Sequence, residues 1–377
     1  MKISSNFLKT TIQQEIERHN GCISFEYFME LALYHPEWGY YNQPTFDIGK
    51  QGDFTTAPVT SPLFARCFAH QLREIFKSFP VYQVLELGPG TGHFAKDLLL
   101  ALKEFGISVQ YYLYEKNLNL RQKQKKFFQL NCPQLLDHMI WLDQLPHEFK
   151  GIIIANEVLD ALPVRCFTIK NHEIKERMVA FKNNEFIFEE AVPDFELKKI
   201  ISTLCDTYDL PDHYTSEINL KLTPFLQSVI QSLSQGVILF SDYGYGQSEY
   251  YHPKRNQGTL TAFYQHQHHE NVLARPGFQD ITAHVDFTRV AEISTENACT
   301  LLGYTTQATF LLANDLIPYI EQAEVNLNEV ERFHLHQTIK QLTFPTEMGE
   351  RIKVMALAKA LTCPLSGFEW SDRRMAL

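Results

Sequence analysis

From residue 81 onward, short apolar runs alternate with stretches whose apolar positions recur at helical spacing. This alternation is typical of βαβ units, in which each strand of a parallel sheet is followed by a helix that covers the sheet. The pattern therefore predicts an α/β fold with a mostly parallel sheet. The strands expected from it span residues 81–87, 109–115, 138–143, 151–157 and 236–244.

The first eighty residues follow a different pattern. Apolar side chains at helical spacing between residues 10 and 33 predict a pair of helices, and Ser24 is placed to cap the second one. Pro36 and Gly39 end the helical pattern and open an aromatic loop at residues 34–43. Its aromatic side chains have two interpretations, either the packing of a lid onto the core or one wall of a binding cleft.

An insertion separates the fourth and fifth expected strands. Its alternating residues 165–190 predict a β-hairpin that turns at 182–184, and a helix is expected near 197–208. Two late apolar runs, 305–313 and 352–360, predict a closing antiparallel pair at the edge of the sheet. We expect three parts, namely N-terminal helices with a covering loop (1–80), a core with insertions (81–163 and 235–377), and an inserted substrate-side region (164–234).

A glycine loop, residues 88–92, links the first expected strand to the helix that follows. Glycines at this point allow a tight turn and a close approach of a ligand to the backbone. The spacing G-x-G-x-G differs from the G-x-G-x-x-G of dinucleotide sites and favours a nucleoside over a pyrophosphate. Glu86, just before the loop, favours a cationic ligand such as S-adenosylmethionine, which carries a sulfonium and an amino group. The ligand-binding residues expected in the loop are Gly88, Pro89, Gly90 and Gly92.

Two further acids follow the next strands. Glu115 comes 23 residues after Gly92, close to the spacing of about 20 at which such folds place an acid on ribose hydroxyls. Without the glycine loop, Glu115 fits equally well as a surface acid that caps the following helix. Asp143 ends the third strand, where it can accept a hydrogen bond from an adenine amino group.

Composition narrows the range of partners. The formal net charge of −10 argues against nucleic acid as a partner, and the basic run at 121–126 is interpreted as a solvated helix face without function. Seven scattered cysteines without a CxxC pair predict neither a disulfide framework nor a zinc site. His266, His268 and His269 lack a completing acid or cysteine, so no metal is expected. With no signal peptide or membrane span in the sequence, we expect a cytoplasmic location.

Several blocks of the sequence together resemble one family. They are ALYHPEWGYY, GDFTTAP, LELGPGTG, NEVLDALPV, SDYGYG, DITAHVDF and MGERIKVMAL, and they extend over nearly the whole chain in the family's order. The sequence resembles the MidA-like class I S-adenosylmethionine-dependent methyltransferases, which include a mitochondrial assembly factor for respiratory complex I. The resemblance implies a Rossmann-like sheet, S-adenosylmethionine as cofactor and, for the mitochondrial member, methylation of arginine on a complex I subunit.

The block at residues 52–58 adds candidate residues through this resemblance. Gly52, Asp53 and Phe54 are expected to bind the cofactor from a loop that folds over it. Where the family commonly has TSPE after GDF, this chain has TAPV at 56–59, so a carboxylate is missing. This departure affects the expected identity of the substrate more than the expected binding of the cofactor.

The block at residues 156–163 places Asn156, Glu157 and Asp160 at the carboxyl end of the fourth strand, the edge at which open α/β sheets bind ligands. Methylation of a guanidinium needs carboxylates that orient the cation and accept one proton. We therefore expect Glu157 and Asp160 to be catalytic and Asn156 to contact the cofactor. The structural alternative makes Asp160 a turn residue before Pro163 and Glu157 a partner in a loop ion pair.

The sequence thus predicts a methyltransferase that acts on arginine of a partner protein, with a complex I subunit or its bacterial counterpart implied by the resemblance. Two alternatives stay open, an assembly or binding protein that holds S-adenosylmethionine as a structural or sensing ligand, and a small-molecule methyltransferase. The glycine spacing disfavours an NAD-linked oxidoreductase. A homodimer is possible, and neither nucleic-acid binding nor membrane insertion is expected.

Overall fold

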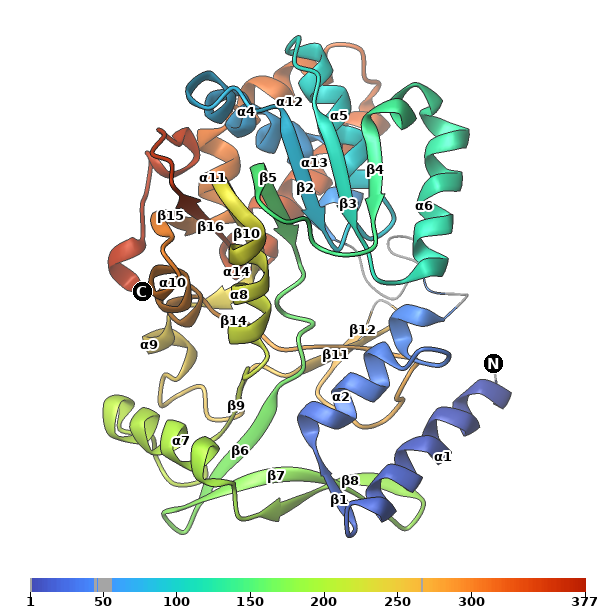
Figure 1. Cartoon of the computed structure of the whole chain (residues 1–377), viewed down its shortest axis with the longest axis vertical. Coiled ribbons are helices and arrows are strands. Elements are labelled where there is room, and N and C mark those ends of the chain that lie inside the picture. Colours follow the sequence, from blue (N-terminus) through green and yellow to red (C-terminus); the bar gives the residue numbers. More distant parts are fainter. Residues whose placement is uncertain (1, 44–45, 47–55, 266) are drawn as a thin grey trace. The chain divides into compact units, whose positions relative to one another are not determined.

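The computed structural model describes residues 2–43, 46, 56–265 and 267–377 (Figure 1). The chain forms two compact units and crosses between them repeatedly. The first unit comprises Met1–Phe54, Leu159–Thr223 and Tyr245–Asp286, and the second comprises Thr55–Val158, Pro224–Gly244 and Phe287–Leu377. This grouping differs from the three expected parts, because the expected inserted region, 164–234, is shared between the two units.

The second unit is built on a sheet of mostly parallel strands. These are β2 (Gln83–Leu87), β3 (Gln110–Tyr114), β4 (Met139–Leu142), β5 (Phe149–Asn156), β10 (Leu233–Tyr245), β15 (Thr300–Thr306) and β16 (Ile352–Lys359). Their order is β15-β16-β10-β5-β2-β3-β4. The run from β10 to β4 is parallel throughout, and β16 is antiparallel to both β10 and β15. The expected α/β fold, with antiparallel pairing at one side, is confirmed.

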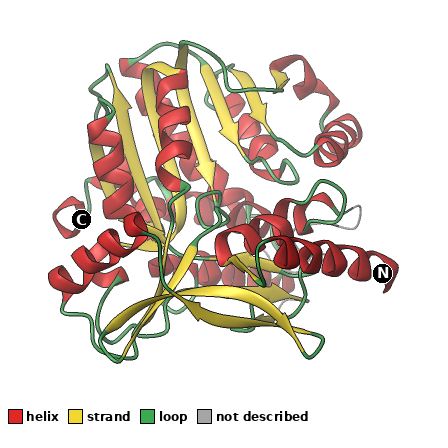
Figure 2. Cartoon of the chain, turned by 60° about the horizontal axis from the view of Figure 1, so that its bottom comes forward, coloured by secondary structure: helices red, strands yellow, loops and turns green. Residues whose placement is uncertain are grey.

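Helices accompany this sheet (Figure 2). The helix α4 (Pro62–Ser78) precedes β2 and begins where Ser61 accepts a hydrogen bond from the amide of Leu63, with proline at the first helical position. The other helices of at least seven residues are α5 (His93–Glu104), α6 (Leu118–Asn131), α8 (Leu222–Ser232), α10 (Phe287–Glu296), α11 (Gln307–Ala313), α12 (Leu316–Glu324) and α13 (Glu329–Thr343). Short helical turns are α3 (Ala57–Thr60), α14 (Met348–Arg351), η2 (Pro133–His138), η3 (Ser366–Phe368) and η4 (Arg374–Ala376).

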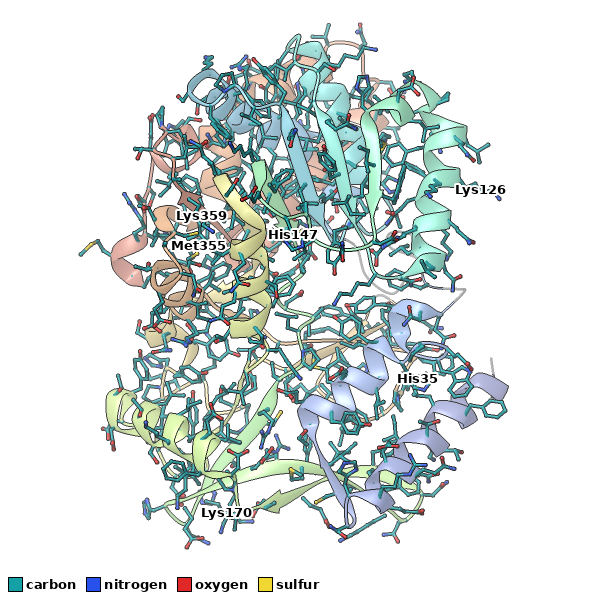
Figure 3. The ribbon with its side chains drawn as sticks, viewed as in Figure 1. His35, Lys126, His147, Lys170, Met355 and Lys359 are labelled. Atoms are coloured by element: carbon teal, nitrogen blue, oxygen red, sulfur yellow. The ribbon has the colours of Figure 1, made fainter. Side chains whose placement is uncertain are left out.

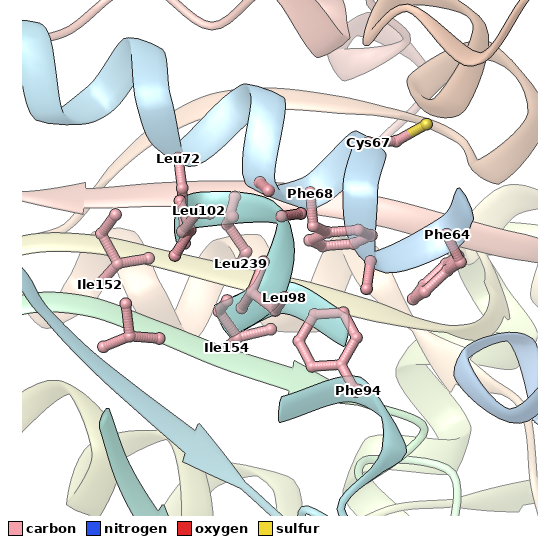
Figure 4. Packing of buried hydrophobic residues seen from close by; sticks show 14 of the residues in the cluster. Phe64, Cys67, Phe68, Leu72, Phe94, Leu98, Leu102, Ile152, Ile154 and Leu239 are labelled. Carbon is pink, nitrogen blue, oxygen red and sulfur yellow. The ribbon is translucent and has the colours of Figure 1, made fainter. Parts of the chain in front are cut away.

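Aromatic side chains of these helices pack over the apolar strands (Figure 4). Phe68 of α4 is fully buried, and its ring centroid lies 5.5 Å from that of Phe94 on α5 and 4.8 Å from that of Phe310 on α11. Ile154 of β5 and Leu239 of β10, both fully buried, belong to the same cluster. This packing joins helices that are distant in sequence to the middle of the sheet.

The first unit has two smaller sheets. The strands of these sheets are β1 (Cys22–Ser24), β6 (Arg165–Lys170), β7 (Glu173–Lys182), β8 (Glu185–Ala191), β9 (Thr215–Ile218), β11 (Thr261–Tyr264), β12 (Gln267–His269) and β13 (Asp280–Thr282), and the two-residue strand β14 (Val285–Asp286) belongs to neither of them. One sheet has the order β1-β7-β6-β9 with β8 on β7, and the other has the order β12-β11-β13. Its helices are α1 (Lys2–Arg18), α2 (Phe25–Tyr34), η1 (Tyr40–Asn42), α7 (Phe195–Tyr208) and α9 (Gln247–Tyr250). Among the described residues of either unit, no helix is both long enough and apolar enough to cross a membrane.

Local predictions in the first unit are confirmed. The side chain of Ser24 accepts a hydrogen bond from the amide of Tyr27 and so caps α2. The predicted hairpin is β7 and β8, and it turns at Asn183 and Asn184, whose φ angles are 51° and 68°. Two consecutive positive φ angles are typical of a type I′ turn, which suits the twist of paired strands.

The prediction of a strand over 305–313 is wrong for most of its length. The antiparallel partner of β16 is β15, which ends at Thr306, and α11 begins at Gln307. Thr306 caps this helix by accepting a hydrogen bond from the amide of Thr309. A short apolar run fits a buried strand and a buried helix equally well, so the cap and the packing decide.

Phe68→Ala is expected to lower the free energy of unfolding by about 3–5 kcal/mol, because it removes the ring at the centre of the aromatic cluster and leaves a cavity. Urea unfolding followed by circular dichroism measures the change. As a matched control, Phe333→Ala removes a ring that is 58% exposed on α13 and is expected to change stability by less than about 0.5 kcal/mol. Equal effects of the two substitutions would contradict the described core.

Candidate cofactor site

Strand register brings the expected site residues to one edge of the sheet. Leu87 of β2 lies opposite Tyr114 of β3 and Ala155 of β5, and Tyr114 lies opposite Leu142 of β4. Because these strands are parallel, the residues that come next along each of them emerge at the same edge. Those residues are Gly88, Glu115, Asp143 and Asn156.

The glycine loop turns sharply between β2 and α5. Gly88, Gly90 and Gly92 have φ angles of 62°, 52° and 86°, a region that other residues rarely adopt. The amide of Gly92 donates to the carbonyl of Pro89 at 2.9 Å and closes the turn. Gly92 also stands immediately before α5, so the loop leads directly into a helix N-terminus.

The loop has little room for side chains. A Cβ atom at Gly88 would lie 2.9 Å from Cγ2 of Val158, and one at Gly92 would lie 2.9 Å from Cε2 of Phe128. Both distances are shorter than a normal contact, so glycine is required by space as well as by φ. The predicted close approach of a ligand to the backbone of this loop stays a prediction.

Glu86 is buried, with 3% of its surface exposed, at the end of β2. Its carboxylate accepts a hydrogen bond of 2.8 Å from the hydroxyl of Tyr111. Burial raises the pKa of Glu86 to about 8, the tyrosine hydrogen bond opposes this shift, and the charge of Glu115 adds to it. The side chain is therefore mostly protonated at neutral pH, and a cation placed beside it would favour its ionised form.

Glu115 follows β3 and is half-buried. Its Oε1 accepts a hydrogen bond of 2.9 Å from the amide of Asn117. Burial raises its pKa to about 7, while hydrogen bonds from the backbone and the charge of Arg121 oppose the shift. The capping role left open for Glu115 is taken by Asn117, whose side chain accepts from two amides at the start of α6. A titrating acceptor at this edge suits ribose hydroxyls, and that assignment stays a prediction.

The interpretation of residues 121–126 as a wholly solvated helix face is wrong. Lys126 is exposed on the outer side of α6 (Figure 3), whereas Arg121 and Gln124 are buried. Gln124 donates from Nε2 to the carbonyl of Gly90 at 2.7 Å and accepts from Nε1 of Trp141 at 2.9 Å. It thereby supports the glycine loop from behind. The spacing of Arg121, Gln124 and Phe128 on one helix face was a signal that could have revealed this.

Arg121 joins the ends of two strands. Its guanidinium donates to the carbonyl of Glu115, to the carbonyl of Leu142 at 2.7 Å and to the carboxylate of Asp143. A buried guanidinium needs such partners, because burying an unpaired charge is costly. The side chain of Asp143 is 91% exposed despite this ion pair. Its proposed contact with adenine stays a prediction.

Asn156 and Glu157 lie where β5 ends. Glu157 has a φ of 52°, which is unusual for a residue other than glycine and is common at functional sites. Its Oε1 accepts hydrogen bonds from the amide of Ala57 at 3.4 Å and from Nδ2 of Asn156 at 3.1 Å. Oδ1 of Asn156 is buried and has no hydrogen-bond partner among the described residues. A buried acceptor of this kind fits a donor brought by a ligand, such as an amino group.

Asp242 of β10 lies in the block SDYGYG. It is almost fully buried, and its carboxylate accepts hydrogen bonds from the amides of Val158 at 3.0 Å and Tyr243 at 2.8 Å. These contacts anchor the backbone that follows β5. Asp242 therefore contributes to the site at least by fixing that loop.

The remaining expected residues lie outside the described part of the second unit. Asp160 belongs to the first unit, where it is buried and its carbonyl accepts a hydrogen bond from the amide of Ala283. Gly52, Asp53 and Phe54 lie outside the described residues. Across the residues that are described, no cluster of histidine, cysteine and acidic side chains is arranged to hold a metal ion.

Glu86→Gln is expected to raise stability at about pH 8 but not at about pH 5. The carboxyl group titrates near 8 when folded and near 4.5 when unfolded, so its contribution is fully present below the lower value and is lost as pH rises through the higher one. In urea unfolding, the free energy of unfolding of the variant relative to that of the wild type should rise by on the order of 1 kcal/mol per pH unit between about pH 5 and pH 8. Asp137→Asn, at an exposed acid, is the control. A pH-independent difference would contradict the raised pKa.

Comparison with known proteins identifies the family to which the chain is similar. Residues 63–305 match the model of Methyltransf_28, a family of S-adenosyl-L-methionine-dependent methyltransferases. The chain is 27% identical over 372 residues to the protein arginine methyltransferase NDUFAF7 homolog, mitochondrial, of Drosophila melanogaster, covering 89% of this chain and 82% of that protein. It is also 27% identical over 393 residues to mitochondrial protein arginine methyltransferase NDUFAF7 of Danio rerio, covering 92% and 89%.

Solved structures extend the match to the whole fold. A COG1565 superfamily member from Burkholderia thailandensis, bound to S-adenosyl-homocysteine, superposes with a TM-score of 0.93 at 32% identity and covers 100% of this chain and 97% of that one. A native structure of a COG1565 protein from the same organism gives a TM-score of 0.91 at 33% identity. S-adenosylmethionine, the expected cofactor, is confirmed by these matches. The chain belongs to the Methyltransf_28 family of S-adenosyl-L-methionine-dependent methyltransferases.

Proposed function

We propose that this methyltransferase acts on an arginine side chain of a partner protein, with a respiratory complex I subunit or its bacterial counterpart as the candidate. The observation that carries the proposal is the alignment of about nine-tenths of the chain with relatives named protein arginine methyltransferases. The carboxylates at the two proposed catalytic positions, Glu157 and Asp160, support it.

A guanidinium is protonated at neutral pH, so its methylation requires groups that orient the cation and accept one proton. When bound, S-adenosylmethionine supplies an electrophilic methyl group. The chain's own residues then have to hold an arginine nitrogen in line with that group, keep water away and take up the proton. Carboxylates are suited to holding the arginine nitrogen in position and to taking up the proton.

Within the first unit, Asp160 lies in surroundings suited to a cation. Asp160 is 6% exposed, and the carbonyl of the adjacent Ala161 accepts a hydrogen bond of 2.8 Å from the hydroxyl of Tyr34. The ring of Tyr34 lies 5.4 Å from that of Tyr41, whose hydroxyl donates to Asp280 at 2.7 Å. Burial, followed by nearby acids that include Asp280 and Asp160, raises the pKa of Tyr41 well above its usual value. Aromatic rings beside buried carboxylates commonly hold guanidinium groups, which supports a binding role for the aromatic loop.

Glu157 complements Asp160 in this proposal. Its carboxylate is held by the amides of Ala57 and Asn156, so its direction is fixed before a substrate arrives. A fixed carboxylate at the carboxyl end of β5 is suited to orienting a guanidinium or to accepting its proton. Glu157 and Asp160 are proposed to divide these two tasks between them.

The proposed cofactor contacts with described residues all belong to the second unit. The backbone of the glycine loop approaches the ligand, Glu115 accepts from the ribose hydroxyls and Asp143 accepts from the adenine amino group. Glu86 and Asn156 face the cationic amino acid end. The loop that contains Gly52, Asp53 and Phe54 is proposed to cover the ligand.

Two expectations on location and assembly stay predictions. They are the cytoplasmic location and the homodimer. The relatives are named mitochondrial, and that description applies to them.

Glu115→Ala is expected to weaken S-adenosylmethionine binding by about 1–3 kcal/mol, the cost of losing a charge-assisted hydrogen bond. Calorimetry at about pH 8 measures it, because a pKa of about 7 leaves the carboxylate ionised there. In the wild type, the part of the affinity due to Glu115 should rise as pH increases through 7, and the variant should lack that rise. Asp137→Ala is the control. Normal binding by Glu115→Ala would assign the ribose to another acid.

Asp160→Asn is expected to leave cofactor affinity near normal and to lower the rate of methyl transfer by about 10²-fold or more, the range that general acid–base groups contribute. The amide keeps the size of the side chain but cannot accept the proton. Label transfer to the identified partner, paired with calorimetry, measures both quantities. Asp206→Asn, at an exposed acid of the same unit, should behave as the wild type. Full transfer by Asp160→Asn would remove this residue from the mechanism.

The substrate itself is tested with methyl-labelled S-adenosylmethionine and a lysate from the source of the protein, followed by mass spectrometry of the labelled species. Label on an arginine of one protein is the expected result. Label on a small molecule would favour the small-molecule alternative. Tight cofactor binding without any transfer would favour the assembly or binding protein.

A further inference from the structure

Strand β8 lies at an edge of the larger sheet in the first unit, where it pairs with β7 (Figure 1). It pairs with β7 from Glu176↔Ala191 to Lys182↔Glu185 without a register shift. Among the described strands, none pairs with its other side. Such an edge presents unpaired backbone N–H and C=O groups, which proteins usually protect with charged side chains, proline or a bulge. β8 contains no proline and no bulge, and its charged residues are Glu185, Glu189 and Glu190, so the protection that it has is acidic.

The edge is also acidic. Residues 185–196, EFIFEEAVPDFE, contain five carboxylates and no lysine or arginine. Three of them have partners on neighbouring strands, in the ion pairs Glu189–Lys182, Glu190–Lys170 and Asp194–Arg165. Glu185 and Glu196 are exposed and form no ion pair with any described residue. The segment therefore carries a carboxylate outside any ion pair near each of its ends.

Two large apolar side chains follow the strand directly. Val192 is 79% exposed and Phe195 is 84% exposed, and both lie within the same acidic segment. Single exposed apolar residues are common, but two of them beside an open strand edge are typical of a binding surface. The edge thus combines backbone groups, charge and apolar contact area.

We propose that β8 binds an extended, basic segment of the protein substrate as an added strand. The proposal rests on the proposed function in one respect, that the substrate is a protein; the basic character of the bound segment is inferred from the acidic edge itself. Backbone hydrogen bonds to β8 supply affinity without sequence preference. Basic side chains of the segment face Glu185 and Glu196, and apolar ones contact Val192 and Phe195, which gives the edge its selectivity.

The test uses the full chain and a fluorescent peptide of about ten residues in which arginine and valine alternate, a length that matches one strand. Two altered peptides serve as controls for the ligand. One carries N-methyl groups on alternate backbone nitrogens, which removes hydrogen-bond donors but keeps every charge, and the other has glutamate in place of arginine. Fluorescence anisotropy should show saturable binding of the parent peptide that weakens with added salt. Both altered peptides should bind at least about tenfold more weakly.

Protein variants locate the contact. The double substitution Glu185→Lys/Glu196→Lys is expected to weaken peptide binding by at least about tenfold. The matched control, Glu321→Lys/Glu369→Lys, makes the same change in net charge at exposed acids of the second unit and should bind the peptide as the wild type does. Calorimetry with S-adenosylmethionine should give wild-type affinity for both double variants.

Three outcomes would overturn the proposal. They are equal binding of the N-methylated peptide, equal loss of binding in the control variant, and no binding of the parent peptide. Analytical sedimentation tests whether a second copy of the chain binds the edge instead. If the wild type is a dimer and the Glu185→Lys/Glu196→Lys variant is a monomer, the edge binds a second copy and the proposal is overturned. Failure of the proposed function is distinguishable, since it would leave peptide binding at β8 intact while no arginine receives a methyl group.

Discussion

Hydrogen bonding between β2 and its two parallel neighbours, β3 and β5, fixes the position of nearly every candidate residue in the second unit. In this register Leu87, Tyr114 and Ala155 lie opposite one another, so that the three strands end at the same edge of the sheet. Apolar side chains on the strands are buried under helices, and polar groups collect where the strands end. A one-residue shift in this register would turn each of these side chains to the other face.

The edge is then reinforced by helix α6. Arg121 ties the end of β3 to the end of β4, and Gln124 ties the glycine loop to Trp141. These buried polar side chains are fully engaged with backbone groups and neighbouring side chains, which is the condition under which burying them is tolerated. The glycine loop is therefore held in place by α6, a helix that contributes no ligand contact of its own in the proposed site.

The sequence predicted the five strands from 81 to 244 because each is an apolar run bounded by helical periodicity, and it predicted the hairpin because two asparagines tolerate positive φ. It failed at 305–313, where a run of the same composition becomes a helix once Thr306 caps it. It also failed at 121–126, because the charge of Arg121 suggested solvent while its spacing with Gln124 placed both inside. Composition alone does not reveal which face of a helix is covered.

By itself the sequence determined the elements of the site that depend on local geometry and chemical type. Gly88, Gly90 and Gly92 predict a loop with positive φ angles, which the structure has. Acidic residues at the ends of strands predict an edge that binds a ligand. Only the tertiary structure decided the state of those groups. Glu86 is largely protonated at neutral pH because burial in the assembled sheet raises its pKa, with a further contribution from the charge of Glu115, and the hydrogen bond from Tyr111 on the next strand only partly opposes this shift. Solvent exclusion and hydrogen-bond partners are properties of the assembled sheet, and no single segment of the sequence carries them.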